Sequence, residues 1–253
     1  MTKPVFTGVA AAVVTFFDEH GHVDNDATAG HARHLVDRGV RAIVVAGSTG
    51  EASHLSMKER LVLFDAVKQE IGTEVPILLG TGMLAAGVSV AALTKRAAQH
   101  EASAALVLSP HHGDVAHFYS DVVNAAGSMP VIAYHHPSVS PHGIPIDTLK
   151  SLKVAGLKDS SGNPERLLEE LAHFKQAIYV GNSAILAYAG LLGCAGAILA
   201  VANLEPELCS DAFAGNVTAQ RDLLSYHKLY ATQGVKGLKE ELARRFHTST
   251  AQR

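Results

Sequence analysis

The stretch VAGLKDSSGN, residues 154–163, decides the fold class. The apolar run 154–157 is typical of a short buried strand, and the polar run 159–162 predicts a turn directly after it. A continuous apolar run without polar alternation is expected for a parallel strand that is buried on both faces. Lys158 stands at the end of this strand, although a lysine is almost never fully buried without a reason.

Further apolar runs of the same kind recur along the whole chain. Stretches with helical periodicity separate them, and one of these begins with the capping-box pair Ser56 and Glu59 and ends at Gly72. The predicted strands are 8–17, 42–47, 76–82, 104–110, 130–137, 154–160, 177–182 and 196–203, and the predicted helices include 24–40, 56–72, 85–101 and 163–176.

Alternation of strand and helix about eight times predicts parallel βα units, and the count favours a closed (β/α)8 TIM barrel of the α/β class. The alternative is an open doubly wound sheet, but the GTG of residues 80–82 lacks the spacing of a dinucleotide fingerprint. The expected organisation is a barrel over residues 1–204. Further helices over 205–253, with 236–246 as the last, should pack on the barrel as part of the same structural unit.

Composition excludes several classes of partner. A formal net charge of −3 gives no reason to expect nucleic acid or an anionic membrane. The apolar run near the N-terminus is shorter than the ~20 residues that a membrane span needs, so it is expected to be a strand. Cys194 and Cys209 are too few for a disulfide framework, which favours a reduced, cytoplasmic setting.

The carboxyl ends of the strands in such a barrel meet at one mouth, where active sites lie. A desolvated Lys158 would have a lowered pKa, and a neutral amine can attack a ketone to form a Schiff base; a lysine that only reaches out to solvent is the alternative. The turn Gly47-Ser48-Thr49-Gly50-Glu51 could hold an anion with its backbone N–H groups, or be an ordinary turn. Tyr134 adds a phenol one strand away from the lysine, unless it is only a core residue. Together the three features predict a 2-keto-acid aldolase.

The chain resembles the dihydrodipicolinate synthase/N-acetylneuraminate lyase family of class I, pyruvate-dependent aldolases. The resemblance covers residues 8–203, with a weaker similarity at 234–242. It rests on the order and spacing of GVAAAVVTFFDEHGHVD, GSTGEASHLS, PILLGTG, YHHP, GLKDSSGN and GAILAVAN.

The resemblance implies the site residues by position. Lys158 would form the Schiff base with pyruvate, Tyr134 would be the general acid and base, and Ser48 would relay its proton. The substrate would be bound by Thr49 with the amides of the turn at Gly47, and by the main chain near Gly181 and Ile198. No metal or organic cofactor is expected, and the partners would be a 2-keto acid, an aldehyde and further copies of the chain in a homodimer or homotetramer.

Three departures from the family pattern change the expected substrate. Val139 stands where the synthase has an arginine for the carboxylate of its aldehyde, which argues against 4-hydroxy-tetrahydrodipicolinate synthase activity proper. His111 and His112 replace a tyrosine of the proton relay, and His112 is a candidate proton shuttle. The C-terminal helical region is shorter than is usual in the family, which bears on the tetramer more than on the dimer.

The histidines near the mouth predict a polar acceptor pocket for a hydroxylated or aromatic aldehyde. His136 and His112 are the candidates for substrate contact, with His111 and His135 as neighbours and at least one of each pair expected to point to solvent. Two other functions compete with the aldolase: a non-catalytic or regulatory barrel, and a metal-dependent hydrolase that would use His20 and His22.

Overall fold

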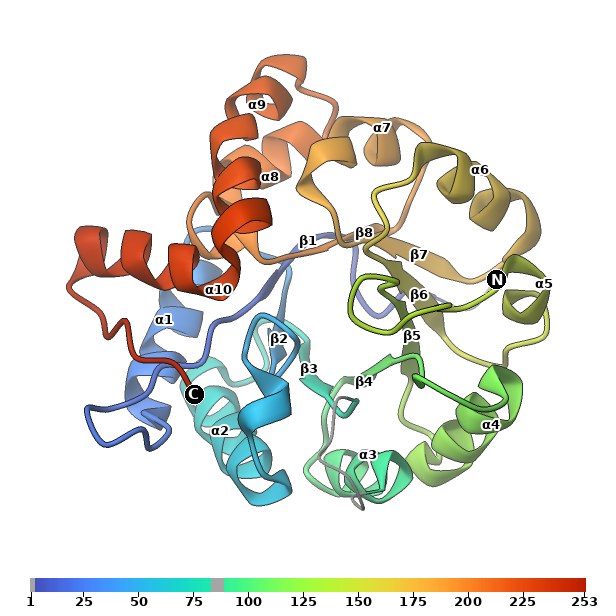
Figure 1. Ribbon diagram of the computed structural model, residues 1–253, viewed down its shortest axis with the longest axis horizontal. Helices are drawn as coiled ribbons and strands as arrows, with labels where there is room; N and C mark the ends of the chain where they lie inside the picture. The colour runs from blue at the N-terminus through green and yellow to red at the C-terminus, as the bar shows by residue number, and fades with distance from the viewer. Residues whose placement is uncertain (1–2, 83–88) are drawn as a thin grey trace.

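The computed structural model describes residues 3–82 and 89–253. Its strands form a closed parallel barrel in sequence order, β1 to β8, with each strand followed by helical structure (Figure 1). The strands are β1 Gly8–Ala12, β2 Ala42–Val45, β3 Ile77–Gly80, β4 Ala104–Leu108, β5 Val131–His135, β6 Gly156–Asp159, β7 Ala177–Val180 and β8 Gly196–Leu199. The predicted (β/α)8 barrel is confirmed.

The helices surround the barrel. They are α1 Asn25–Asp37, α2 Met57–Ile71, α3 Val90–Gln99, α4 Val115–Ala126, α5 Ile146–Leu149, α6 Pro164–His173, α7 Leu186–Leu191, α8 Pro206–Phe213, α9 Val217–Asp222 and α10 Leu224–Phe246. The Ser56–Glu59 capping box is present at the start of α2, and Gly72 ends that helix as predicted. The expected helix 85–101 begins outside the described residues, and its described part is α3.

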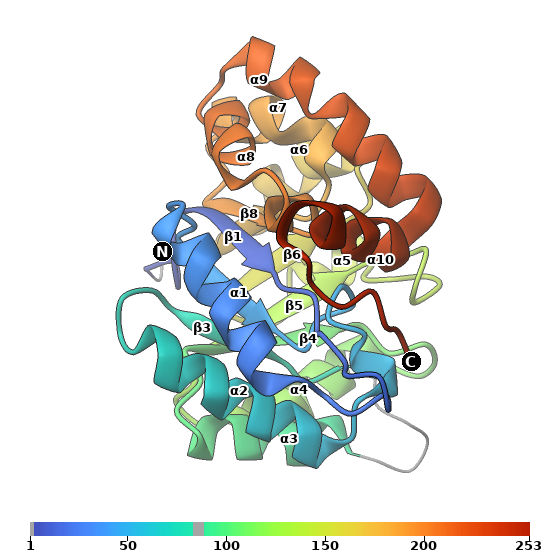
Figure 2. The same ribbon diagram turned by 90° about the vertical axis from the view of Figure 1, so that its left-hand side faces the viewer.

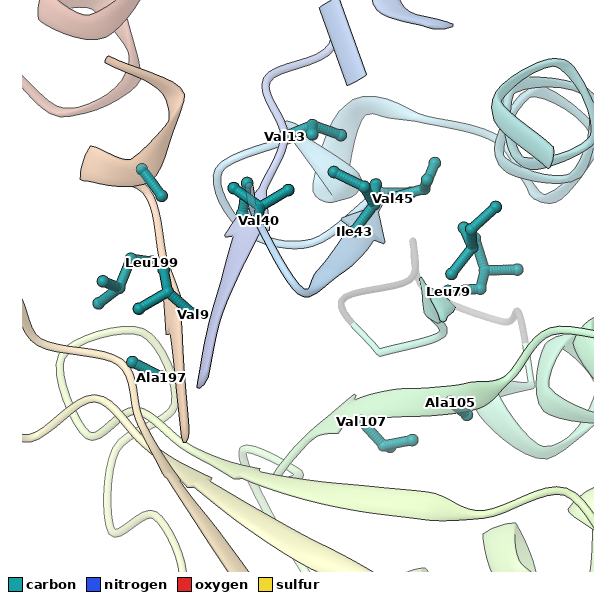
Figure 3. Close-up of a cluster of buried hydrophobic side chains, with 14 of the residues drawn as sticks. Val9, Val13, Val40, Ile43, Val45, Leu79, Ala105, Val107, Ala197 and Leu199 are labelled. Carbon is teal, nitrogen blue, oxygen red and sulfur yellow. The ribbon is translucent and has the colours of Figure 1, made fainter. Parts of the chain in front are cut away.

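Side chains of the strands alternate between the inside of the barrel and the layer of helices. Val9, Val45 and Leu79 belong to the outer hydrophobic cluster between strands and helices, part of which Figure 3 shows. Tyr134, Tyr179 and Ile198 belong instead to the cluster inside the barrel. Lys158 pairs in register with Tyr134 of β5 and with Tyr179 of β7, so it lies on the same inner face.

The predicted last helix, 236–246, is the second half of α10. α10 begins at Leu224 and contains a break at Gly234, where φ is 59° and ψ is −143°. A residue with positive φ is strained unless it is glycine, so glycine fits this break. Leu238 and Leu242 of α10 pack with Val14, Phe16 and Leu204, next to the end of β1 (Figure 2). No helix in the described part of the chain is long and apolar enough to cross a membrane.

Candidate active site

A cavity of about 380 Å³ opens at the carboxyl ends of the strands. It is lined from β2, β5, β6, β7, β8 and α10 by Thr49, Tyr134, His136, Ser138, Lys158, Ser160, Ser161, Gly181, Asn182, Ser183, Ile198, Leu199, Ala200, Val201, His227, Tyr230, Ala231 and Gly234. A groove of about 730 Å³ between α2 and α3 is larger, but it lies on the outside of the barrel away from the strand ends. Position in the barrel therefore favours the smaller cavity as the reactive one.

Lys158 lies at the bottom of this cavity with only 5% of its surface exposed. Burial lowers the pKa of its amine from 10.5 to about 7. Among the described residues, no carboxylate lies within ion-pair distance of its Nζ atom, which sits 4.1 Å from the centre of the Tyr134 ring. Because nothing compensates the desolvation of the ammonium, a large fraction of this lysine is a free amine at neutral pH.

Gly181 explains how the lysine side chain fits. A Cβ atom at position 181 would lie 2.9 Å from Cε of Lys158 and 1.9 Å from Oγ of Ser160. A side chain at position 181 would therefore displace Lys158 and Ser160 from these positions, and glycine avoids this. This places the main chain of Gly181 beside the amine, on the side opposite to Tyr134.

The phenol of Tyr134 has two hydroxyl neighbours. Its oxygen lies 3.3 Å from Oγ of Ser48, and it accepts a hydrogen bond of 3.4 Å from Oγ of Ser160. Burial raises the pKa of the phenol, and the hydrogen bonds from Ser160 and Ser48 lower it. The phenol is therefore protonated at neutral pH and has a hydroxyl chain through which a proton can move.

The turn 47–51 joins β2 to α2 and carries Thr49, whose exposed fraction is 4%. Its own backbone hydrogen bonds run from Glu51 N to Ser48 O and from Ala52 N to Gly47 O, so they do not use the N–H groups of residues 48–50. Oγ1 of Thr15 donates to the carbonyl oxygen of Gly50 at 2.7 Å, which holds the turn against the end of β1. Such a row of backbone N–H groups is suited to an anion.

The four histidines near the mouth have different surroundings. His136 lines the cavity, its Nδ1 atom is buried without a hydrogen-bond partner in the described residues, and burial lowers its pKa to about 4. His135 is buried outside the cavity, where its Nδ1 accepts from the Ile144 N–H. His111 and His112 are exposed and do not line the cavity.

His112 lies in an exposed turn after β4, outside the cavity of its own chain, so its role as a proton shuttle stays a prediction. Of the other predicted residues, seven line the cavity or bond to a residue that does: Lys158, Tyr134, Ser48, Thr49, His136, Gly181 and Ile198. Gly47 lines a small hollow next to Tyr134 together with Ser48.

Sequence reasoning missed the part of the cavity that α10 supplies. His227 lies with Nδ1 3.0 Å from Oγ of Ser183, and Tyr230 lines the cavity together with Thr49. Burial raises the pKa of the Tyr230 phenol. The only available signal was their spacing of three residues, which puts them on the same face of a helix.

The described residues offer no set of metal ligands for the alternative function, a metal-dependent hydrolase. His20 and His22 lie in an exposed turn near Glu19 and Asp18, away from the cavity. In residues 3–82 and 89–253, no three His, Cys, Asp or Glu side chains converge as metal ligands would. Asn203, after β8, donates to the carbonyl oxygens of Ala12 and Ala200 and so has a structural role.

Comparison with known proteins gives one consistent family. The profile of the dihydrodipicolinate synthetase family matches residues 5–239. An uncharacterized DapA-like lyase of Halobacterium salinarum is 37% identical over 79% of this chain and 69% of its own, and a 4-hydroxy-tetrahydrodipicolinate synthase of Parasynechococcus marenigrum is 34% identical over 73% and 67%. The structure of the Acinetobacter baumannii dihydrodipicolinate synthase complexed with pyruvate superposes with a TM-score of 0.88 at 26% identity, covering 98% of this chain and 91% of that one. The chain belongs to the dihydrodipicolinate synthetase family of aldolase-type lyases.

Proposed function

We propose that this protein condenses pyruvate with an aldehyde, or cleaves a 2-keto-3-deoxy acid to pyruvate and an aldehyde, through a Schiff base on Lys158. The observation that carries the proposal is the buried, unpaired amine at the bottom of the cavity, with a pKa lowered to about 7. An amine in this state is a nucleophile near neutral pH, which an ordinary surface lysine is not.

The reaction begins when the amine lone pair of Lys158 attacks the keto carbon and the keto oxygen takes a proton from Tyr134. Loss of water from the resulting carbinolamine gives an iminium ion, and loss of a proton from the adjacent carbon gives an enamine. That carbon then forms a bond to the aldehyde carbon, while the aldehyde oxygen takes a proton through Tyr134. Hydrolysis of the new imine releases the product and restores the lysine; cleavage runs the same steps in reverse.

The carboxylate of the keto acid would bind at the turn 47–51. The hydroxyl of Thr49 and the backbone N–H groups of residues 48–50 are the donors for it, and the main chain near Gly181 and Ile198 would border its other side. The similar structure of the Acinetobacter baumannii synthase is a complex with pyruvate, which supports the choice of keto acid.

The acceptor end supports a neutral, hydroxylated aldehyde. The lining there consists of Ser138, Ser161, Asn182, Ser183 and His227, and it includes no arginine. Val139 packs with the cluster inside the barrel instead of offering a cation. A carboxylate on the aldehyde would lose its water without gaining a charge-assisted partner, which is unfavourable.

The proposal also covers the cellular compartment and the oligomeric state of the protein. A cytoplasmic setting is proposed because the two buried cysteines, Cys194 and Cys209, are free, which fits reducing conditions. A homo-oligomer is proposed because the exposed turn with His111 and His112 is free to face a second copy. Residues 205–253 would fold together with the barrel, as the packing of Leu238 and Leu242 against Phe16 suggests.

Trapping with borohydride tests the proposal. Incubation with pyruvate and borohydride should add one reduced pyruvyl group to the protein, and peptide mass spectrometry should locate it on Lys158. Lys158→Met should lose the adduct, and Lys153→Met, at an exposed lysine just before the same strand, should keep it. A turnover screen of 2-keto-3-deoxy sugar acids then follows.

The outcomes separate the competing functions. An adduct on Lys158 with no turnover of any 2-keto-3-deoxy acid or aldehyde would support a non-catalytic or regulatory barrel. Turnover with aspartate semialdehyde would support 4-hydroxy-tetrahydrodipicolinate synthase activity, although Val139 replaces the expected arginine. No adduct, together with tightly bound metal in the purified protein, would contradict the aldolase and support the hydrolase.

A further inference from the structure

Two strained backbone positions frame the turn 47–51. Ala46, directly before the turn, has a φ of 52°, and Glu51, its last residue, has a φ of 54° and a ψ of 37°. Both residues lie in the left-handed region, which non-glycine residues avoid because Cβ crowds a neighbouring carbonyl oxygen. A residue in this state persists only where its surroundings hold it in place. The contacts of the two residues therefore show what fixes the turn.

The first half of the turn is held by the ends of neighbouring strands. A Cβ atom at position 80 would lie 2.0 Å from the Ala46 carbonyl oxygen, so the backbone of Gly80 in β3 packs directly against Ala46. A Cβ atom at Gly50 would lie 3.0 Å from the Val13 carbonyl oxygen, and Oγ1 of Thr15 donates to the Gly50 carbonyl oxygen at 2.7 Å. These contacts all come from the barrel itself.

Glu51, by contrast, is held by a part of the chain that is distant in sequence. Its Oε1 atom lies 2.5 Å from Nζ of Lys239, a side chain of α10 with no exposed surface, and its Oε2 atom accepts from the backbone N–H of Arg253 at 3.2 Å. Nζ of Lys239 also donates to the Ala251 carbonyl oxygen at 2.6 Å. The Arg253 guanidinium pairs with Glu59 of α2, and Figure 1 shows the end of the chain next to the start of that helix. The C-terminal segment therefore fixes both oxygens of the Glu51 carboxylate.

The conformation of Glu51 also fixes the residues ahead of it. Its backbone N–H donates to the Ser48 carbonyl oxygen at 3.1 Å, which closes the turn and leaves the N–H groups of residues 48–50 outside this bond. Thr49, in the middle of the turn, lines the cavity that contains Lys158. A change of φ at Glu51 to an ordinary negative value would rotate the turn against α2, and the N–H groups and the Thr49 hydroxyl would move with it.

We propose that Glu51 is a positioning residue for the keto-acid carboxylate: its pairing with Lys239 holds the strained turn so that Thr49 and the N–H groups of residues 48–50 face the substrate. This inference rests on the proposed function. Glu51 does not itself line the cavity, so it acts through the turn. The ion pair opposes the backbone strain, and donors that are oriented before the substrate arrives lower the free-energy cost of binding it.

The test compares two double variants that both lack the ion pair, Glu51→Ala/Lys239→Met and Glu51→Gly/Lys239→Met. Neither leaves an unpaired buried charge, so the main cost of breaking a buried pair is avoided. They differ in one methyl group, and only glycine tolerates a positive φ without strain. In borohydride trapping, the pyruvate concentration for half-maximal adduct formation should rise at least roughly 5-fold in the Ala variant and less than roughly twofold in the Gly variant. The maximal trapping rate should stay within roughly twofold in both.

Glu101→Ala/Lys68→Met is the matched control. Glu101 has a positive φ of 59°, and its Oε2 atom lies 2.7 Å from Nζ of Lys68, so the same strain and the same kind of ion pair are present. Glu101 precedes β4, at the end of the barrel opposite to the cavity. This variant should leave the half-maximal pyruvate concentration unchanged.

A second ketone separates positioning from a general structural effect. Acetone has no carboxylate, so its trapping rate should be equal in both double variants and the unaltered protein. Equal half-saturation by pyruvate in the Ala and Gly variants would overturn the inference, and so would a loss of acetone trapping as large as that of pyruvate trapping. If the Ala variant does not fold, Glu51→Gln, which keeps one acceptor for Lys239, should still raise the half-maximal pyruvate concentration roughly twofold; no rise would overturn the inference. Absence of any adduct in the unaltered protein would instead refute the Schiff base of the proposed function, and this inference with it.

Discussion

Two lysines are buried among the described residues, and they differ in their partners: one pairs with a carboxylate and the other does not. Lys158 faces the cavity with no carboxylate of the described residues within ion-pair distance, and burial lowers its pKa to about 7. Lys239 of α10 is fully buried; its Nζ is 2.5 Å from Oε1 of Glu51, donates to the Ala251 carbonyl oxygen at 2.6 Å, and lies over the Phe17 ring. Burial lowers the pKa of Lys239 as well, but the Glu51 carboxylate opposes that effect. The difference shows that a partner, rather than burial alone, decides whether a lysine stays charged.

Removal of the unpaired lysine should have the largest effect on activity. Lys158→Met keeps an unbranched apolar side chain in the barrel but removes the nucleophile, so turnover should fall by roughly 10⁴-fold or more. The measurement is initial-rate kinetics with the best substrate of the screen. Activity within tenfold of the unaltered protein, roughly one hydrogen bond in free energy, would show that the amine is dispensable.

Removal of the paired lysine should act on stability instead. Lys239→Met leaves the buried Glu51 carboxylate without its cation, and this should lower the free energy of unfolding by about 4 kcal/mol. Denaturant titration measures it, with Lys236→Met as the control at an exposed position of the same helix. The double variant with Glu51→Leu should recover part of the loss. Equal stability of the Lys239 and Lys236 variants would mean that the buried pair contributes nothing.

The unpaired lysine should destabilise the fold, so Lys158→Met should raise the free energy of unfolding at neutral pH by about 4 kcal/mol. The sign follows from its pKa, which is about 7 in the folded chain against a model value of 10.5. Between these values the unfolded chain binds more protons, so this group makes stability rise with pH across that window. The Met variant should lose that rise. Identical pH dependence in both proteins would contradict the lowered pKa.

The ring and the hydroxyl of Tyr134 can be separated with Tyr134→Phe. The ring stays beneath the amine, so adduct formation should persist, while loss of the acid and base should reduce turnover by roughly 10²-fold. Ser138→Ala, at another cavity position but away from the proton path, offers a comparison within the same pocket. A Phe variant with full turnover would move the proton transfer to another group.

The sequence predicted those parts of the site that strands carry. Continuous apolar runs ending in Lys158, Tyr134 and the turn after β2 were enough, because parallel strands in a barrel bring their ends to one mouth. The predicted strands were too long at these ends, since the chain turns away from the barrel wall where the polar residues begin. For example, β6 ends at Asp159, and Ser161 then caps its carboxylate with N–H and hydroxyl donors.

The contribution of α10 could not be predicted. Its residues are far in sequence from the strands they contact, and the direction of the helix depends on the break at Gly234 and on the Lys239–Glu51 pair. Neither leaves a local pattern. The histidine pairs show the same limit: His135 ends β5 and His136 follows it, and adjacent residues of an extended segment point to opposite sides. Only the position of the strand within the barrel determines that His136 faces the cavity.

The contrast between the two lysines can be measured as the charge of Lys158 itself. Competitive labelling with an amine-reactive reagent over a range of pH, quantified on the peptide that contains Lys158 and with the exposed Lys153 as reference for reagent loss, gives its titration curve. A midpoint near pH 7 is the expected result. A midpoint near the ordinary value of 10.5 would mean that Lys158 is an ammonium ion at neutral pH, and the proposed chemistry would have no nucleophile.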